Sequence, residues 1–267
     1  MNRPVDINYS LFSSGNAYVD FLDVEQVEEM AQAHRRARQP PASSGQTRFG
    51  LTPPLYYNLA DGIAANRRIN DALRQAANAS GDVWFGVVEP KFGEAAVSEI
   101  HRIAGLGAAG VVWSPRAQGL FASDRSMSAM CRAAADSGLL SMIHSAPFSV
   151  NESLDRIWNL ATACEGAAIV VIGAFTSWEN IQIARNARGG PGNVSYDTSG
   201  LGETWDLQGL IADIGADRLV FGSGGPRFSS EAMELIERSA LEPPDRDAIL
   251  SANAARLLGT RLRPEES

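Results

Sequence analysis

The chain has 267 residues, of which 45% are hydrophobic and 20% are charged, as is usual for a globular protein. Its 23 Lys and Arg residues against 31 Asp and Glu residues give a net charge of −8, which argues against a protein that binds the nucleic-acid backbone. Two cysteines exclude a disulfide framework and a cysteine-rich zinc module. The sequence shows no membrane-spanning apolar run and no secretory signal. We therefore expect a cytoplasmic protein that binds neither nucleic acid nor membranes.

Short apolar segments recur along the whole chain. Each is about 4–8 residues long, aliphatic or β-branched, and bounded by turn residues, which is typical of strands buried on both faces. The predicted strands cover residues 4–8, 47–51, 83–88, 110–113, 139–144, 168–173, 193–197 and 218–222.

Amphipathic segments of helical length alternate with these strands. Asp23 with Gln26, and Thr176 with Glu179, have the spacing of capping boxes at helix starts. Glycines are predicted to end two of the helices, at positions 166 and 189. The predicted helices cover residues 23–38, 66–79, 94–105, 126–137, 152–164, 176–189, 207–214, 230–239 and 245–258.

Strands that alternate with helices indicate βαβ units and a parallel sheet. Eight such units in about 250 residues match an α/β fold of the (β/α)₈ TIM-barrel type. We predict one barrel domain over residues 1–267. A doubly wound open sheet is the alternative, but the segment after the first predicted strand lacks the glycine-rich fingerprint typical of that fold.

Barrel enzymes place their active sites at the carboxyl ends of the strands, which singles out His144 at the end of the fifth. A histidine there can donate or accept a proton near neutral pH, or it can be a structural residue bonded to a neighbour's backbone. For Glu89 and Lys91, after the third strand, we expect a rim ion pair rather than an acid–base pair. The predicted substrate contacts at the mouth are Asn8, Ser10, Lys91, Trp113, Arg116, Asp197, Ser223 and Arg227.

Three of these positions have specific arguments. The glycine-rich turn 222–225 exposes backbone amides that can bind an anion, and Arg227 after it could grip a carboxylate or phosphate. Asp197 could bind substrate or could only cap the following turn. Trp113, which leaves the fourth strand, is the best candidate to face a ligand.

Several segments together resemble the amidohydrolase-related family of metal-dependent barrels, which includes aminocarboxymuconate-semialdehyde decarboxylase-like and lactonase-like enzymes. VDINYS (5–10) stands where that family has D-x-H-x-H, and SMIHS (141–145) resembles its strand-five histidine segment. NVSYDTSG (193–200) is similar to "NV-x-x-D-T-S-G", and DRLVFGSGGP (217–226) to "D-R-x-x-F-G-S-D-x-P". NAARLLG (253–259) is close to the family's C-terminal helix motif.

The resemblance implies a metal site whose ligands this chain mostly lacks. The family holds zinc or manganese with the two H-x-H histidines, a strand-five histidine and a strand-eight aspartate. The corresponding residues here are Asn8, Ser10, His144 and Gly224, and Gly173 stands where a further histidine lines the family's site. One imidazole cannot hold a catalytic zinc ion, which takes about three protein ligands. We therefore expect no metal and no other cofactor.

On this basis we expect a degenerate family member, a pseudoenzyme that serves as a non-catalytic or regulatory subunit paired with an active relative. Because members of this family commonly form dimers, we expect a homodimer or a heterodimer with a paralogous barrel. One alternative is a metal-independent hydrolase or decarboxylase-like enzyme that uses His144 on a small anionic carboxylate substrate. The others are a small-molecule binding protein and a metalloenzyme whose ligands come from a partner chain. Whether the protein is an enzyme stays open at this point.

Overall fold

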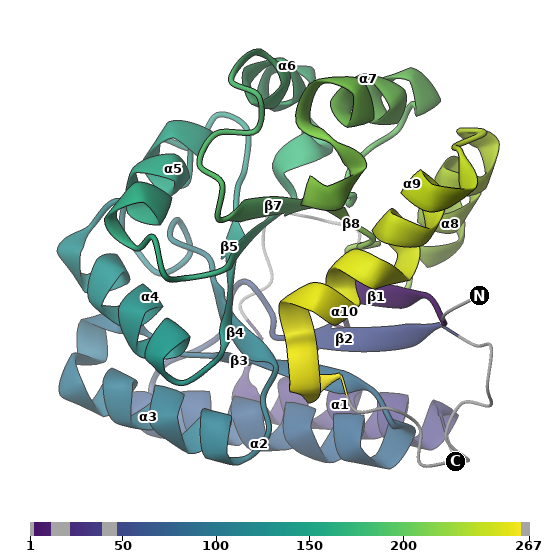
Figure 1. Ribbon diagram of the computed structural model, residues 1–267. Helices are drawn as coiled ribbons and strands as arrows, with labels where there is room; N and C mark the ends of the chain where they lie inside the picture. The colour runs from purple at the N-terminus through teal and green to yellow at the C-terminus, as the bar shows by residue number, and fades with distance from the viewer. Residues whose placement is uncertain (1–2, 12–21, 39–46, 263–267) are drawn as a thin grey trace.

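The computed structural model describes residues 3–11, 22–38 and 47–262. Within them, eight parallel strands form one sheet in chain order (Figure 1). Each predicted strand overlaps an observed one. The strands are β1 (Val5–Ser10), β2 (Arg48–Thr52), β3 (Val83–Val87), β4 (Gly110–Trp113), β5 (Leu140–His144), β6 (Ile169–Ile172), β7 (Val194–Asp197) and β8 (Leu219–Val220).

The sheet curls until its first and last strands meet. The Ile7 amide donates to the Phe221 carbonyl at 2.9 Å, and the Gly224 amide donates to the Asn8 carbonyl at 2.8 Å. These bonds join β1 to the segment that follows β8. The (β/α)₈ barrel predicted from the sequence is therefore confirmed, and the doubly wound alternative is wrong.

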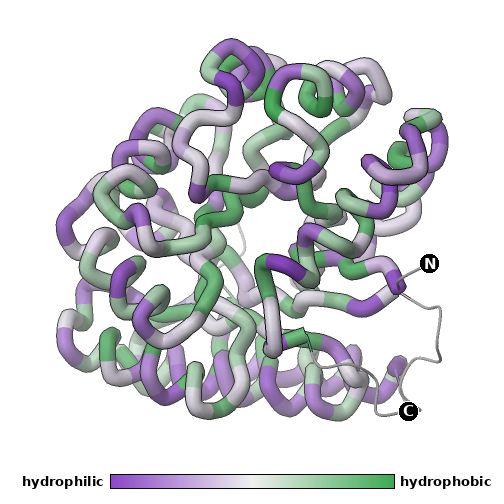
Figure 2. Tube along the Cα trace, viewed as in Figure 1, coloured by the Kyte–Doolittle hydropathy of each residue, from purple (hydrophilic) through white to green (hydrophobic). Residues whose placement is uncertain are grey.

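Helices surround the strands, and apolar residues concentrate along the strands (Figures 1 and 2). No helix within the described ranges is long and apolar enough to cross a membrane, while the cytoplasmic location stays a prediction. The helices are α1 (Val24–Ala37), α2 (Ile63–Ser80), α3 (Glu94–Gly105), α4 (Arg125–Asp136), α5 (Leu154–Ala163), α6 (Trp178–Asn186), α7 (Thr204–Ile214), α8 (Ser229–Arg238), α9 (Pro243–Asp247) and α10 (Asn253–Leu258).

The last predicted helix, 245–258, is not continuous. A π-helical turn, Ala248–Ala252, separates α9 from α10. Within this turn the Ile249 carbonyl accepts a hydrogen bond from the Phe221 amide at 2.9 Å. Because this carbonyl serves the strand segment, the regular helical hydrogen-bond ladder is interrupted where the chain packs against the barrel.

The predicted helix ends are partly confirmed. Gln26 Oε1 accepts from the Asp23 amide at 2.9 Å, as a capping box requires. Gly189 is wrong as a cap, because α6 ends at Asn186 and Ala187 is its C-cap. The box at Thr176 is wrong, because Ser177 is the N-cap of α6 and its hydroxyl accepts from the Asn180 amide at 3.3 Å. Gly166 is also wrong as a cap, since α5 ends at Ala163.

Strand alternation divides the core into two layers. One cluster joins Ile7, Phe85, Met142 and Val220, from strands around the whole barrel, and so fills the interior. The larger cluster lies between strands and helices, and fully buried Trp113 belongs to it. The prediction that Trp113 faces a ligand is therefore wrong, because alternation turns it away from the mouth.

β1 contains an irregularity that shapes the mouth. Its register passes from Asp6 opposite Phe49 to Tyr9 opposite Leu51, so two β1 residues, Ile7 and Asn8, face the single residue at position 50 of β2. This is the pattern of a β-bulge, which re-aims side chains near active sites. The bulge determines where the Asn8 amide group lies.

The β1 backbone and the Phe85 ring lie so close to position 50 that only glycine fits there. A Cβ at this position would lie 2.7 Å from both the Ile7 carbonyl oxygen and the Phe85 ring. We expect Gly50→Ala to lower the free energy of unfolding by about 1–3 kcal/mol, as overpacking does. Urea denaturation measures this loss. Gly166→Ala is the matched control, because a Cβ there meets nothing within 4 Å. Equal stabilities of the two variants would contradict the proposed crowding.

Candidate functional site

His144 and Glu152 form a pair at the barrel mouth. His144 ends β5 with its side chain 22% exposed, and its Nδ1 lies 3.0 Å from Oε1 of Glu152, whose side chain is 1% exposed. The other Glu152 oxygen accepts from the Arg116 amide at 3.2 Å, and the Ser145 hydroxyl donates to the Glu152 carbonyl at 3.0 Å. Glu152 is thus fixed from several sides and orients the imidazole through Nδ1. His144 bonds a carboxylate, not the neighbouring backbone of the alternative interpretation.

Asp197 lies fully buried at the end of β7. Its Oδ2 accepts from Asn8 Nδ2 at 2.8 Å, and its Oδ1 accepts from the Gly173 amide at 2.9 Å. Burial raises the pKa of this carboxyl to about 6, against hydrogen bonds from Ser199, Asn8 and Gly173 and the charge of His144, which lower it. The carboxyl therefore bonds to neighbouring strands instead of only capping a turn.

Gly173 connects the histidine to this carboxyl. Its backbone has a left-handed φ of 71°, which glycine adopts without strain. A Cβ here would lie 3.3 Å from His144 Nε2, so the glycine leaves room beside that nitrogen. Because the Gly173 amide also binds Asp197, the imidazole and the carboxyl share one backbone neighbour.

Asp6 is a second fully buried carboxyl, at the join between β1 and β8. Its Oδ1 accepts from the amides of Ser223 and Asn8 at 3.0 and 3.3 Å. Its Oδ2 is buried without a hydrogen-bond partner. Burial raises the pKa of Asp6 to about 7, and the charge of Asp197 adds to the rise.

Two of these residues were not among the candidates taken from the sequence. The signal for Asp6 was its place as the first residue of the D-x-H-x-H-like segment. Glu152 gave no comparable signal, because it sits eight positions after His144 in a connecting segment, and only the folded loop brings the two together.

The small polar candidates divide between the site and its border. Asn8 is in the site and also accepts from the Thr52 hydroxyl at 3.4 Å. Ser10 is half-buried at the end of β1, in register with Thr52. Ser223 is buried, and its hydroxyl accepts from the Gly225 amide at 3.1 Å, which organises the glycine-rich turn.

The predicted cationic contacts lie apart from the pair. Lys91, Arg116 and Arg227 are exposed, and Arg116 reaches Glu152 through its backbone amide. The Arg227 guanidinium lies 5.6 Å from the Phe228 ring centroid. The expected ion pair of Glu89 with Lys91 is absent among the described residues, where the Tyr57 hydroxyl binds Glu89 instead.

The donor set at this mouth does not fit a catalytic metal ion. Throughout residues 3–11, 22–38 and 47–262, no three or more His, Cys, Asp or Glu side chains are grouped so as to hold one. The Asp197 oxygens already accept two hydrogen bonds, from Asn8 Nδ2 and the Gly173 amide. Catalytic zinc takes about three protein ligands and an open position.

Comparison with known proteins places this barrel among relatives. The amidohydrolase family model Amidohydro_2 matches residues 18–260. No curated protein matches the chain significantly in sequence. Solved structures similar in fold include 5-carboxyvanillate decarboxylase from Sphingomonas paucimobilis, with a TM-score of 0.70, 17% identity and coverage of 97% of this chain and 99% of that one.

Two further solved structures have the same fold. One is 2,6-dihydroxybenzoate decarboxylase from Rhizobium, with a TM-score of 0.69, 16% identity and coverage of 97% and 99% of the two chains. The other is dihydroxybenzoic acid decarboxylase from Polaromonas sp. JS666, solved with manganese and 2-nitroresorcinol. It has a TM-score of 0.67, 16% identity and coverage of 97% and 98%. At these identities the likeness establishes the fold.

The buried Asp6 carboxyl predicts a pH dependence of stability. Burial makes its pKa higher in the folded protein, about 7, than the ordinary carboxyl value of 3.8. The Asp6 carboxyl therefore stays protonated to a higher pH in the folded state than in the unfolded state. The stability that this proton gives is lost as pH rises from about 4 through about 7. Asp6→Asn keeps the acceptor for the two amides and has no proton to lose. We expect its melting temperature, relative to wild type, to rise between pH 5 and pH 8. A constant difference over that range would contradict the assignment.

Proposed function

The chain belongs to the amidohydrolase family, and we propose that it is a metal-independent acid–base enzyme acting on a small carboxylate substrate, in a decarboxylase-like or hydrolytic reaction. The observation that carries the proposal is the His144–Glu152 pair, with Nδ1 held at 3.0 Å and the ring partly open to solvent at the mouth. An imidazole whose other nitrogen is fixed by a carboxylate is a common form of general acid or base.

Asp197 strengthens this proposal. Two titratable groups that share one backbone neighbour and differ in environment can divide acid and base roles. The pKa of Asp197, raised to about 6, makes its carboxyl a group that changes protonation near physiological pH. His144 would act on the substrate, and Asp197 would bias the charge of the imidazole beside it.

The substrate class takes its support from the solved relatives, whose names describe decarboxylases of 5-carboxyvanillate and 2,6-dihydroxybenzoate. On such a hydroxylated benzoate, the bond from the ring to the carboxylate carbon breaks. Its electron pair stays on the ring carbon, which takes a proton from the His144 imidazolium, and carbon dioxide leaves. Solvent then returns a proton to the imidazole. The reaction consumes one proton and needs no redox partner.

Kinetics of His144 and Glu152 variants test the proposal with 2,6-dihydroxybenzoate and 5-carboxyvanillate, followed by carbon dioxide release. His144→Ala removes the proton donor and should lower kcat by about 10²–10⁴-fold. Glu152→Gln keeps the bond from Arg116 but removes the charge beside the imidazolium. We therefore expect kcat to fall more than KM changes, and the alkaline limb of the pH–rate profile to move to lower pH.

His101→Ala is the control, because this histidine is exposed on α3, away from the mouth. Metal analysis of protein purified without chelator belongs to the same experiment. Turnover should survive EDTA treatment, and metal content should stay near zero after loading with zinc or manganese. Full activity of His144→Ala, or activity lost in EDTA and restored by manganese, would overturn the proposal.

A non-catalytic subunit is the second candidate, favoured by apolar side chains exposed around the mouth. Phe148 and Val150, after β5, are 92% and 67% exposed. Trp178 and Trp205, after β6 and β7, are 65% and 64% exposed. Apolar rims of this kind mark interaction surfaces, and a second barrel, identical or paralogous, is the proposed partner. If this candidate is correct, Trp178→Ser abolishes assembly and His144→Ala leaves biological function intact.

A further inference from the structure

A hollow of about 370 Å³ lies beside the end of β3, apart from the His144 site. Neither His144 nor Asp197 lines it. Its walls combine aromatic and apolar side chains with a few charged groups. The lining residues are Asp23, Leu55, Tyr56, Tyr57, Asn58, Leu59, Glu89, Lys91 and Ala117.

Glu89 is the chemical centre of this hollow. It follows β3 and is only 2% exposed. Its Oε1 accepts from the Tyr57 hydroxyl at 2.5 Å, whereas its Oε2 is buried with no hydrogen-bond partner. A buried carboxylate oxygen without a partner costs free energy, so it needs an explanation in a native structure.

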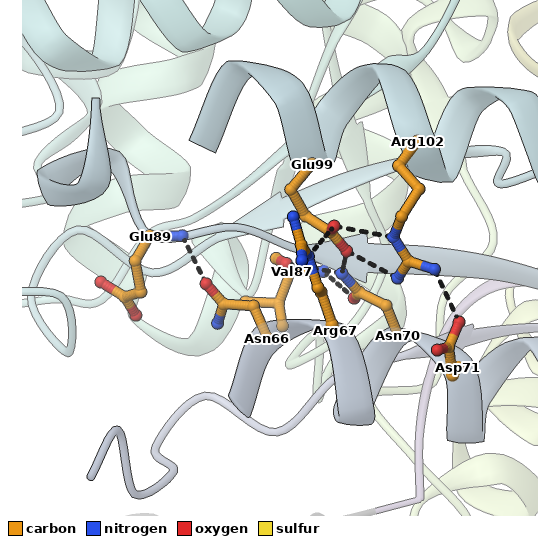
Figure 3. A network of polar contacts seen from close by, with 8 residues as sticks. All are labelled: Asn66, Arg67, Asn70, Asp71, Val87, Glu89, Glu99 and Arg102. Carbon is orange, nitrogen blue, oxygen red and sulfur yellow. Dashed lines mark hydrogen bonds and ion pairs between the residues drawn. The ribbon is translucent and has the colours of Figure 1, made fainter. Parts of the chain in front are cut away.

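A polar network behind the hollow holds Glu89 in place. Asn66 Oδ1 accepts from the Glu89 amide at 3.1 Å, and Asn66 Nδ2 donates to the Tyr57 hydroxyl at 3.4 Å. In Figure 3 the Glu89 carboxylate points away from the network. Asn70, one turn further along α2, bonds both the amide and the carbonyl of Val87. The backbone is thus fixed while the carboxylate is left facing the other way.

Tyr57 cannot relieve the charge of this carboxylate. Burial raises the pKa of its hydroxyl well above the usual value, and the charge of Glu89 adds to the rise. Tyr57 therefore stays protonated and gives its one proton to Oε1. The second oxygen keeps its full capacity to accept a hydrogen bond.

The remaining charged groups leave the hollow with an excess of negative charge. Asp23 lies at the rim, where its Oδ1 accepts from Asn58 Nδ2 at 3.1 Å. Lys91 is exposed, and its ammonium lies 5.6 Å from the centroid of the Phe92 ring. Two acidic residues and one lysine line the hollow, and Tyr56 and Tyr57 supply aromatic surface, which attracts cations.

We propose that this hollow binds a small organic ammonium ion, whose N–H groups donate to Glu89 Oε2 and whose apolar part rests on the tyrosines. A divalent metal fits less well, because two carboxylates are fewer than the oxygen ligands that calcium requires, and no metal-holding group of three such side chains occurs in the described part of the chain. This site is independent of the acid–base role of His144.

Calorimetric titration with benzylamine at pH 7.5, where it is an ammonium ion, tests the proposal. Benzyl alcohol is the neutral probe and should bind at least 10-fold more weakly. Glu89→Gln keeps the size of the side chain and the acceptor for Tyr57, and should weaken benzylamine binding about 10-fold or more. Glu94→Gln is the matched control, since this exposed carboxylate of α3 lies outside the hollow and should leave the Kd unchanged.

Lys91→Met is a second test, in which the affinity for benzylamine is expected to increase instead of decrease. This substitution does not disturb the buried network. Removing the rim cation should tighten benzylamine binding about two- to five-fold. Equal binding of benzyl alcohol, an unchanged Kd in a folded Glu89→Gln variant, or weaker binding in Lys91→Met would each overturn the proposal. Displacement of benzylamine by millimolar Mg²⁺ would also overturn it, by showing a metal site.

Discussion

Closure of the barrel through buried carboxyl groups is the constraint on which the mouth depends. Asp6 ties the bulged part of β1 to the Ser223 amide after β8. Asp197 ties β7 to Asn8 of β1 and to the Gly173 amide after β6. These polar bonds replace the apolar packing that fills the barrel further down. Burial raises the pKa of Asp6 to about 7 and that of Asp197 to about 6, although the hydrogen bonds that close the barrel lower both values.

The closure also divides the mouth into two chemically different parts. On the β5–β8 side, His144 is oriented by Glu152 and lies beside Gly173, which serves Asp197. On the β3 side, Glu89 keeps one oxygen free above a rigid network from α2 and α3 (Figure 3). We propose proton transfer for the first part and binding of an organic ammonium ion for the second. Neither uses the exposed arginines that the sequence suggested as anion contacts.

The sequence predicted the features that depend on neighbouring residues and missed those that depend on contacts between distant ones. Buried strands leave local apolar runs, so the strand series and the barrel were predictable, as was His144 at a strand end. Trp113 was misplaced because an error of one residue in alternation moves a side chain to the other face. Glu152 was missed because its partnership depends on the path of a loop. The π-helical turn depends on a bond from Phe221 to Ile249, distant in sequence.

The positions that the family resemblance matches to metal-site residues have structural roles in this barrel. Asn8 uses its Nδ2 on Asp197 and its Oδ1 on the Thr52 hydroxyl, so its amide is already engaged within the barrel. Gly224 has a φ of 81°, and Gly173 one of 71°, which glycine adopts more readily than a residue with a side chain. A ligating side chain at position 173 would also crowd the His144 ring. Hydrogen bonds thus engage both oxygens of Asp197, and under the proposed metal-independent function the imidazole of His144 is the group that acts on the substrate.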